Sequence, residues 1–342
     1  RGILGALSRK GFAVTFHEPD IAARRDRRDI DPPAWCRVAL YPATDDGVKQ
    51  AAAEAAEADI VIKASGVGHA DEALLGALLA AARPDALKLW WDMDAPATFA
   101  EIGEDETHPL RVALPGLDLV VAAGGGKAVE DGFRRLGAKT CAMAYTGLDP
   151  ETHHPASADP RFACDLAFLG NRLPDREERV ETYFLEPADR LADRKFLVAG
   201  SGWEDKPCPP SVTKLGHLGT DLHNAFNASA RAVLNVNRAG LAATGFCPSP
   251  RLFEAAGAGA CLITDVWRGI EMFLTPGKEV LVARDADDVV EALDTLTPEQ
   301  AKAIGERALE RLLAEHTYDK RAETLAPLLA EARRKKAGER AA

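Results

Sequence analysis

The segment from Ser249 to Gly259 combines the start of a predicted helix with side chains suited to binding an anion. Ser249 is a typical N-cap residue, and Pro250 suits the first helical position. The unpaired N–H groups and the dipole of such a helix start attract negative charge, and Arg251 adds a rigid cationic fork. Glu254, one turn further, either accepts hydrogen bonds from two ribose hydroxyls or is a dipole-favouring acid that binds nothing. The spacing alone leaves both interpretations open.

Glycine, amide and arginine residues also cluster after the predicted strands in the second half of the chain. Ligands of open α/β sheets bind at the carboxyl ends of the strands. Glycine permits close backbone approach there, and Asn and Arg donate hydrogen bonds to phosphates and hydroxyls. The candidate ligand-binding residues are Gly170, Asn171, Arg172, Gly200, Gly202, Trp203, His217, Asn235, Asn237, Arg251, Phe253 and Glu254.

The first half offers a second set of polar residues at predicted strand ends. Asp92 and Asp94 could hold Mg²⁺ or Mn²⁺ as paired carboxylates, but a substrate-side or loop-capping role is the stronger interpretation. The run Gly124, Gly125 and Gly126, between a strand and a helix, permits close approach of a phosphate or makes a tight turn. His69, after another strand, is a substrate-side candidate, with a surface loop as the alternative. No metal site is predicted from these residues.

Apolar strand patterns alternate with helical patterns along the chain, which predicts parallel sheets covered by helices on both faces. A polar, Pro-rich stretch at 151–163 separates two such series and is typical of a linker. The pair His153-His154 in this stretch lacks a third ligand, which favours a loop over a metal site. We therefore predict an N-terminal domain at 1–150 and a C-terminal domain at 164–335.

The expected architecture is α/β, with two Rossmann-like doubly wound domains that face a cleft. A charged tail is expected at 336–342. The chain opens with a helical pattern at Ile3, Leu4 and Leu7, where a doubly wound domain places a strand and a ligand-binding turn. We therefore expect the first strand of the N-terminal domain, with its loop, to be missing.

Composition restricts the class of protein further. The 342 residues include 42 Lys and Arg against 53 Asp and Glu, a formal net charge of −11. An acidic chain without a basic stripe is a poor nucleic-acid binder, and the basic run at 24–28 is interpreted as solvated surface. No apolar run reaches the ~18 residues of a membrane span. The six Cys residues form no CxxC pair, which favours reduced thiols and a cytoplasmic location.

The block RLFEAAGAGACLITD, from Arg251 to Asp265, resembles the donor-binding segment of GT-B glycosyltransferases of the large group-1 clan. Together with further stretches, it is similar to the CgeB-like (spore maturation protein) branch over nearly the whole chain. Those stretches are Trp91–Pro96, Gly124–Gly126, Asp165–Arg172, Ala225–Ser229, Val233–Arg238, Gly269–Asp288 and His316–Tyr318. The resemblance implies that the C-terminal domain holds a nucleotide-sugar donor, and that sugar transfer needs no obligatory metal or cofactor. It also makes Asp92, Asp94, Gly124–Gly126 and His69 candidates for the side of an unidentified acceptor, be it a glycan, a protein or a small molecule.

The chain departs from this family at one position. Many relatives carry two glutamates separated by seven residues, the second of which binds ribose. Glu254 matches the second, but Phe246 occupies the position of the first. This departure bears on the contact to the donor sugar, so the type of sugar is left open.

A transfer reaction requires stabilisation of the leaving diphosphate as its charge develops. We assign this role to Arg172, Arg251 and the helix that begins at Pro250, with Lys206 as a weaker candidate. Trp203, or the backbone near His217, is a candidate contact to the nucleotide base, and a Trp that only packs at the rim of the site is an equally strong interpretation. Retaining transfer, which the resemblance implies, lets the donor phosphate accept the acceptor proton, so no catalytic residue is named.

Three alternatives are compatible with parts of the sequence. A non-catalytic sugar-nucleotide-binding or assembly protein of the same fold would explain the missing first glutamate. A nucleotide-sugar epimerase would need paired acid and base carboxylates, and no persuasive pair is visible. A dinucleotide oxidoreductase ranks lowest because no GxGxxG motif opens any predicted helix.

Overall fold

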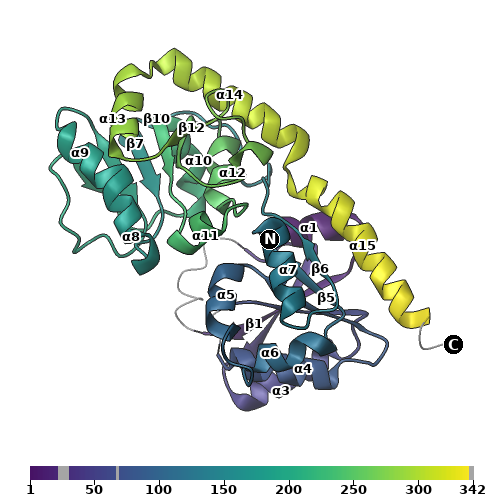
Figure 1. The fold of residues 1–342 in the computed structure, drawn as a ribbon. Coiled ribbons are helices and arrows are strands. Elements are labelled where there is room, and N and C mark those ends of the chain that lie inside the picture. Colours follow the sequence, from purple (N-terminus) through teal and green to yellow (C-terminus); the bar gives the residue numbers. More distant parts are fainter. Residues whose placement is uncertain (22–30, 67–68, 339–342) are drawn as a thin grey trace. The chain divides into compact units, whose positions relative to one another are not determined.

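The computed structural model describes residues 1–21, 31–66 and 69–338, and it divides the chain into two compact units. Unit 1 comprises Arg1–Tyr145 together with the segment from Asp319 onward, and unit 2 comprises Thr146–Tyr318 (Figure 1). The basic run at 24–28 lies outside the described residues. No helix in the described part of the chain is long and apolar enough to cross a membrane.

Unit 1 contains two parallel sheets, with the strand orders β1-β2 and β3-β4-β5-β6. The strands are β1 (Val14–Asp20), β2 (Cys36–Pro42), β3 (Ile60–Ala64), β4 (Leu87–Asp92), β5 (Leu119–Ala122) and β6 (Cys141–Met143). The helices are α1 (Gly2–Arg9), α3 (Asp45–Ala55), α4 (Asp71–Ala81), α5 (Ala95–Ile102), α6 (Pro109–Ala113), α7 (Gly126–Arg135) and α15 (Tyr318–Gly338), with a 3₁₀ turn at Leu114–Gly116. All four residues of β5 are buried, as expected for a strand covered on both faces.

Unit 2 is built on one parallel sheet of six strands, in the order β12-β11-β10-β7-β8-β9. The strands are β7 (Cys164–Leu169), β8 (Phe196–Ala199), β9 (Val212–Lys214), β10 (Ala230–Asn235), β11 (Leu262–Asp265) and β12 (Leu281–Ala283). The helices are α8 (Pro174–Val180), α9 (Glu186–Arg190), α10 (Thr220–Ser229), α11 (Ala239–Thr244), α12 (Pro250–Gly257), α13 (Ala286–Thr295) and α14 (Pro298–Glu315). A π-helical turn at Glu181–Leu185 joins α8 to α9, and 3₁₀ turns lie at Pro160–Phe162 and Ile270–Met272. The prediction of two parallel α/β units is confirmed.

The assignment of the last helix differs from our prediction, which placed residues up to 335 in the C-terminal domain. From Asp319 onward α15 belongs to unit 1. Arg333 pairs with Asp59 and Asp85 at 3.0 and 3.1 Å, and Lys336 pairs with Asp118 at 2.7 Å. These ion pairs join groups more than two hundred residues apart, which local sequence patterns do not reveal. Of the expected tail 336–342, the part up to residue 338 is helical, and the rest lies outside the described residues.

The Pro-rich stretch at 151–163 belongs to unit 2 and lies against α10. The Asn224 side chain accepts a hydrogen bond from the backbone N–H of His154 at 3.3 Å and donates one to the carbonyl of Thr152 at 2.9 Å. The Ser229 hydroxyl accepts a hydrogen bond from the N–H of Asp159 at 2.7 Å. These contacts fix the stretch against a helix, whereas its composition alone suggested a free linker.

Candidate functional site

The carboxyl edge of the unit 2 sheet changes winding direction at β7. The next strand along the chain in this sheet, β8, pairs with one side of β7, and β10 pairs with the other. Such a switch point opens a crevice in which ligands of α/β sheets bind. The loop Gly170–Arg172 follows β7, and Asn237 follows β10, so the fold brings these predicted residues to one place.

Backbone conformation accounts for two of the predicted glycines, and close packing adds to it at Gly200. A Cβ atom on Gly200 would lie 2.3 Å from the carbonyl oxygen of Gly170, and φ of Gly200 is +128°. Gly202 has φ of +88°. The Asn171 side chain accepts a hydrogen bond from the N–H of Ser201 at 2.9 Å and ties the two loops together. Only glycine fits this approach at residue 200, so its presence has a structural cause that requires no ligand.

Arg176, in the first turn of α8, is a cation that the sequence analysis missed. Its guanidinium lies over Gly170, where an added Cβ would be 2.9 Å from Nη2, and it donates to the carbonyl of Asn171. Nε is buried without a hydrogen-bond partner, and no described carboxylate forms an ion pair with Arg176. Burial, and then the nearby charge of Arg251, lower the pKa of Arg176 to about 10. A half-buried guanidinium without a carboxylate partner is suited to receive an anion.

Arg172, to which we assigned the leaving phosphate, is already neutralised by carboxylates. Its Nε and Nη2 donate to both oxygens of Glu177 at 2.8 and 2.7 Å, and Nη1 lies 3.2 Å from Asp205. Lys206, the weaker candidate, donates to the same Glu177 at 2.7 Å and also contacts Glu181. The fold therefore uses both cations to hold loops to α8, and Arg176 replaces Arg172 as the available positive group.

This cluster predicts a pH effect on stability. Hydrogen bonds from Arg172, and then from Lys206, lower the pKa of Glu177 to about 2. A carboxyl with a lowered folded-state pKa stabilises the fold above its unfolded value, ~4.3, and loses that contribution as pH falls toward 2. We expect Glu177→Gln to have a lower melting temperature than the unchanged chain at pH 7. The difference should shrink between pH 5 and 3 in thermal unfolding followed by circular dichroism, and a pH-independent difference would contradict it.

The helix start at Pro250 is confirmed, but Ser249 does not cap it in the usual way. Its side chain makes no hydrogen bond to the helix and donates instead to Oδ1 of Asn235. Arg251 pairs with Glu254 at 3.3 Å, and burial lowers the pKa of Arg251. The first turn of α12 thus carries one partly compensated cation.

A buried polar network lies beneath this edge of the sheet. Nδ2 of Asn235 donates to the hydroxyl of Thr264 at 2.9 Å, and that hydroxyl donates to Asp265 at 3.2 Å. Asp265 is fully buried, pairs with Arg179 and accepts from the N–H of Asn237 at 3.2 Å. Burial raises the pKa of Asp265 against the opposing effect of Arg179. Asn237 is 1% exposed, and neither atom of its amide has a hydrogen-bond partner among the described residues, so its hydrogen-bonding capacity is unused.

Two predicted aromatic contacts are core residues instead. Trp203 is 2% exposed, packs edge-on against Phe168 and donates from its indole to the carbonyl of Gly170 at 2.8 Å. Phe253 is fully buried against the rings of Phe273 and His316. Both rings are packed in the core beside the site, so neither offers an exposed face on which a base could stack. His217 is exposed in the loop after β9.

His153, which the sequence presented as a plain loop residue, lies beside α12. A Cβ atom on Gly257 would be 3.2 Å from its carbonyl oxygen, and its ring stacks on His223 at 6.2 Å. Burial lowers the pKa of His153, while the nearby Glu254 opposes that shift. Nε2 of His153 is buried without a hydrogen-bond partner.

Phe246, at the position of the missing glutamate, has φ of +52°, an uncommon backbone conformation for a bulky residue. Its N–H donates to the carbonyl of Arg268 at 2.6 Å, and the Arg268 guanidinium lies over its ring at 5.6 Å. A Cβ atom on Gly269 would lie 2.3 Å from the ring, so a side chain at residue 269 would collide with it. The loop around this aromatic residue is tightly constrained.

The predicted residues of unit 1 have mainly local roles. Asp92 is fully buried and accepts hydrogen bonds from Thr98, Trp90 and the N–H of Asp94 at 2.6, 3.0 and 2.9 Å. Asp94 is the N-cap of α5 and accepts from Ala97 at 3.3 Å. Burial raises the pKa of Asp92. The two carboxylates thus have the loop-capping role, and no described residue completes a metal site with them.

The glycine run and His69 lie at strand ends, as predicted. Gly125 (φ +94°) is the N-cap of α7, Gly126 (φ +55°) begins the helix, and Gly124 precedes them. The positive φ angles at residues 125 and 126 favour glycine, so the turn alone explains why glycine occurs at these two positions. His69 is half-buried in the turn before α4, and its Nε2 has no hydrogen-bond partner.

Residues 176–326 match the family model described as "Glycosyl transferase-like". No curated protein matches the sequence. The matched segment includes Arg176, Asn237, Arg251 and Glu254, and it therefore spans the cations and the free amide at the edge of the unit 2 sheet.

Solved structures similar to the chain include several glycosyltransferases. Sucrose-phosphate synthase from Thermosynechococcus elongatus is 13% identical, with a TM-score of 0.69 over 96% of this chain and 91% of that one. HepE from Anabaena, solved with UDP and glucose, is 12% identical, with a TM-score of 0.65 over 93% and 99%. An alpha-glucosyltransferase solved with UDP and a 13-mer DNA is 10% identical, with a TM-score of 0.68 over 96% and 94%. The chain therefore has the GT-B fold of two Rossmann-like units, and residues 176–326 are similar to the glycosyl transferase-like family.

Proposed function

We propose that this protein transfers a sugar from a nucleotide-sugar donor, bound at the switch point of unit 2, to an acceptor. The observation that carries the proposal is Arg176, a half-buried cation without a carboxylate partner among the described residues, beside Gly170. Its position at the carboxyl edge of a doubly wound sheet matches where such folds bind phosphates. Arg251 and the amide of Asn237 supply further donors nearby.

In this proposal the protein's own cations stabilise the leaving diphosphate. The bond between the anomeric carbon and the phosphate oxygen lengthens, and negative charge collects on the diphosphate. Arg176 and Arg251 stabilise that charge without an obligatory metal ion. The acceptor hydroxyl oxygen bonds to the anomeric carbon on the face from which the diphosphate departs, and the departing phosphate accepts the hydroxyl proton, so transfer retains the anomeric configuration.

UDP-sugars are the first donors to test, because HepE and the alpha-glucosyltransferase were solved with UDP. We propose a hexose as the transferred sugar and a CgeB-like place within the clan, on the motifs described above. The net charge of −11 argues against nucleic acid as the acceptor, although one structural neighbour was solved with DNA.

The direct test is calorimetric titration with UDP-, GDP-, ADP- and TDP-sugars, followed by assays of donor hydrolysis and transfer. Saturable binding of one donor class with release of the nucleoside diphosphate would support the proposal. Binding without turnover on any acceptor would favour a sugar-nucleotide-binding protein instead. The absence of nucleotide binding at about millimolar concentration would contradict both.

Glu254 gives a residue-level prediction. If it accepts hydrogen bonds from the ribose, Glu254→Ala should weaken binding of the bare nucleoside about tenfold, the usual scale of a hydrogen bond to a charged group. The same change releases Arg251 from its 3.3 Å ion pair, so inorganic diphosphate should bind at least as well as before. Calorimetry with the two probes separates these effects. Unchanged nucleoside affinity would show that Glu254 only balances the charge of Arg251.

A further inference from the structure

The side-chain amide of Asn237, just after β10, is a buried polar group that the fold leaves unpaired. Asn237 is 1% exposed, and neither Oδ1 nor Nδ2 has a hydrogen-bond partner among the described residues. Buried amides are nearly always hydrogen-bonded, because burial removes the water that would otherwise pair with them. An unpaired amide at the ligand-binding edge of a parallel sheet therefore points to a partner from outside the chain.

Asn235, two residues earlier, is an amide that the fold does pair. It is fully buried, its Nδ2 donates to the hydroxyl of Thr264 at 2.9 Å, and its Oδ1 accepts from the hydroxyl of Ser249. Ser249 is the residue before α12. Because side chains alternate between the two faces of an extended chain, the amide of Asn237 is predicted on the same face as Asn235, toward the start of α12.

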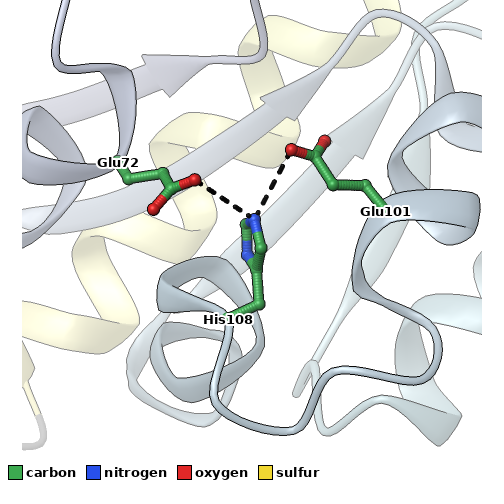
Figure 2. A group of neighbouring side chains, drawn as sticks. All are labelled: Glu72, Glu101 and His108. Atoms are coloured by element: carbon green, nitrogen blue, oxygen red, sulfur yellow. Dashed lines mark ion pairs between the residues drawn. The ribbon is translucent and has the colours of Figure 1, made fainter.

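A cluster in unit 1 likewise consists of groups that pair with one another. Glu72 extends from the first turn of α4 and Glu101 from the last turn of α5, and His108 lies at the start of α6 (Figure 2). Nε2 of His108 is 3.6 Å from a carboxylate oxygen of each glutamate, as the dashed lines mark. Both glutamates are also exposed to water. This cluster therefore needs no ligand, in contrast to Asn237.

Contacts of the backbone and of the next residue place Asn237 beside the cations of the proposed donor site. The N–H of Asn237 donates to Asp265 at 3.2 Å. The side chain of the following residue, Arg238, pairs with Asp175 in the first turn of α8. Arg176 is the next residue of that turn, so Asn237 and Arg176 are each one residue from the same ion pair.

The register of the sheet leads to the same place. Strands β10 and β7 pair with Val233 opposite Ala167. Counting on from this register, Asn237 is level with Asn171, and the carbonyl of Asn171 accepts a hydrogen bond from Arg176. Paired strands are about 5 Å apart, so a diphosphate bound at Arg176 lies within reach of the amide of Asn237.

The two atoms of the amide require different partners. A phosphate oxygen can accept from Nδ2, but a diphosphate has no proton to donate to Oδ1. In a nucleotide sugar, the proton donor closest to the diphosphate through bonds is the hydroxyl on the carbon next to the anomeric carbon. The hydroxyls of the ribose are further away, because the diphosphate is attached to the ribose through its exocyclic carbon.

We propose that Asn237 is a specificity-determining residue of the donor site. Its Oδ1 accepts a hydrogen bond from the hydroxyl next to the anomeric carbon of the transferred sugar, while Nδ2 donates to the diphosphate. The substrate class is therefore a sugar with a free hydroxyl at that carbon. This assignment rests on the proposed function, because it takes the ligand to be a nucleotide sugar.

The test uses the full chain with UDP, UDP-glucose and UDP-2-deoxy-2-fluoroglucose, in which fluorine replaces that hydroxyl and removes its proton. The unchanged chain should bind UDP-glucose about tenfold more tightly than the fluorinated donor, the usual scale of one hydrogen bond to a buried acceptor. Asn237→Leu has nearly the same size and should bind both sugar donors alike, although all three probes bind it more weakly. Asn237→Ala should show the same equal binding. Calorimetry measures each affinity.

Thermal unfolding followed by circular dichroism tests whether the amide is unpaired in the fold. Asn237→Leu should melt no lower than the unchanged chain, because the amide has no partner to lose. The matched change Asn235→Leu should lower the melting temperature, because the hydroxyls of Thr264 and Ser249 then lose their partner. An equal loss in both variants would show that the fold pairs Asn237 after all, and would overturn the proposal.

Two binding results would also overturn it. Equal binding of the two sugar donors by the unchanged chain would show that no residue recognises this hydroxyl. A tenfold preference that persists in both Asn237 variants would assign the hydroxyl to another residue. Absence of binding of every nucleotide sugar to the unchanged chain would instead contradict the proposed function itself, and the assignment would fail with it.

Discussion

Replacing Arg176 with Gln is expected to abolish most donor binding and, at the same time, to stabilise the ligand-free protein. The guanidinium is half-buried beside Gly170 without a carboxylate partner among the described residues, and its pKa is lowered to about 10. A cation with a folded-state pKa below its unfolded value destabilises the fold at every pH below about 10, and this cost disappears only as pH rises above that value. At pH 7 the full cost is therefore present.

The loss of the Arg176 charge sets the expected size of both effects, the gain in stability and the loss of donor affinity. Neutralising Arg176 should raise the free energy of unfolding by on the order of 1 kcal/mol, after discounting the pKa shift for partial exposure. Losing charge-assisted hydrogen bonds to a diphosphate should weaken binding of a UDP-sugar by at least about tenfold. Denaturant unfolding and calorimetry measure the two effects on the same samples.

Arg172→Gln is the matched comparison, because Arg172 follows the same strand but pairs with Glu177 and Asp205. It should destabilise the fold and leave donor affinity within about twofold, since its charge is already compensated. The reverse outcome, with donor binding lost in Arg172→Gln and kept in Arg176→Gln, would reinstate the assignment made from the sequence.

Replacing Asp265 with Ala is expected to be the most destabilising single change at this edge of the sheet. Asp265 is fully buried and is the carboxylate partner of Arg179, which is only 25% exposed. Removing one member of such a pair typically costs about 3 kcal/mol or more, because the other charge stays buried and unpaired. The N–H of Asn237 and the hydroxyl of Thr264 also lose their acceptor.

A double-mutant cycle separates two effects of Asp265: its contribution to stability through the ion pair with Arg179, and its effect on donor binding. Arg179→Met in the Asp265→Ala background should recover about half of the lost stability, since no unpaired charge then remains. Donor affinity should stay low in the double variant, because Asn237 has still lost the carboxylate that fixes its backbone. Urea unfolding and calorimetry provide the readouts, and full recovery of affinity would show that Asp265 acts only through stability.

The main features of the fold were predictable because they depend on local patterns. Buried strands such as β5, β8 and β11 are short apolar runs between helical patterns, and this alternation specifies parallel sheets. The start of α12 was readable from Ser249 and Pro250. The strand β2 was missed because its residues are largely exposed or half-buried and show no clear alternation.

The site itself was only partly predictable. Residue types at strand ends indicated an anion-binding edge, but several arginines lie close together after β7 and the sequence does not rank them. Arg172 meets carboxylates and Arg176 does not, which depends on how α8 packs against the neighbouring loops. Trp203 was a candidate base contact because it follows a predicted strand, yet sheet packing buries it.

The sequence by itself determined the two α/β units, the helix start at Pro250 and the concentration of polar groups at strand ends, since each depends on residues within one or two turns. Only the tertiary structure decided which cations keep their charge uncompensated, which side chains are buried, and that α15 belongs to unit 1. It alone brought Glu72, Glu101 and His108 together from three helices. Compensation and burial are properties of groups that meet in space, and neighbours along the chain do not specify them.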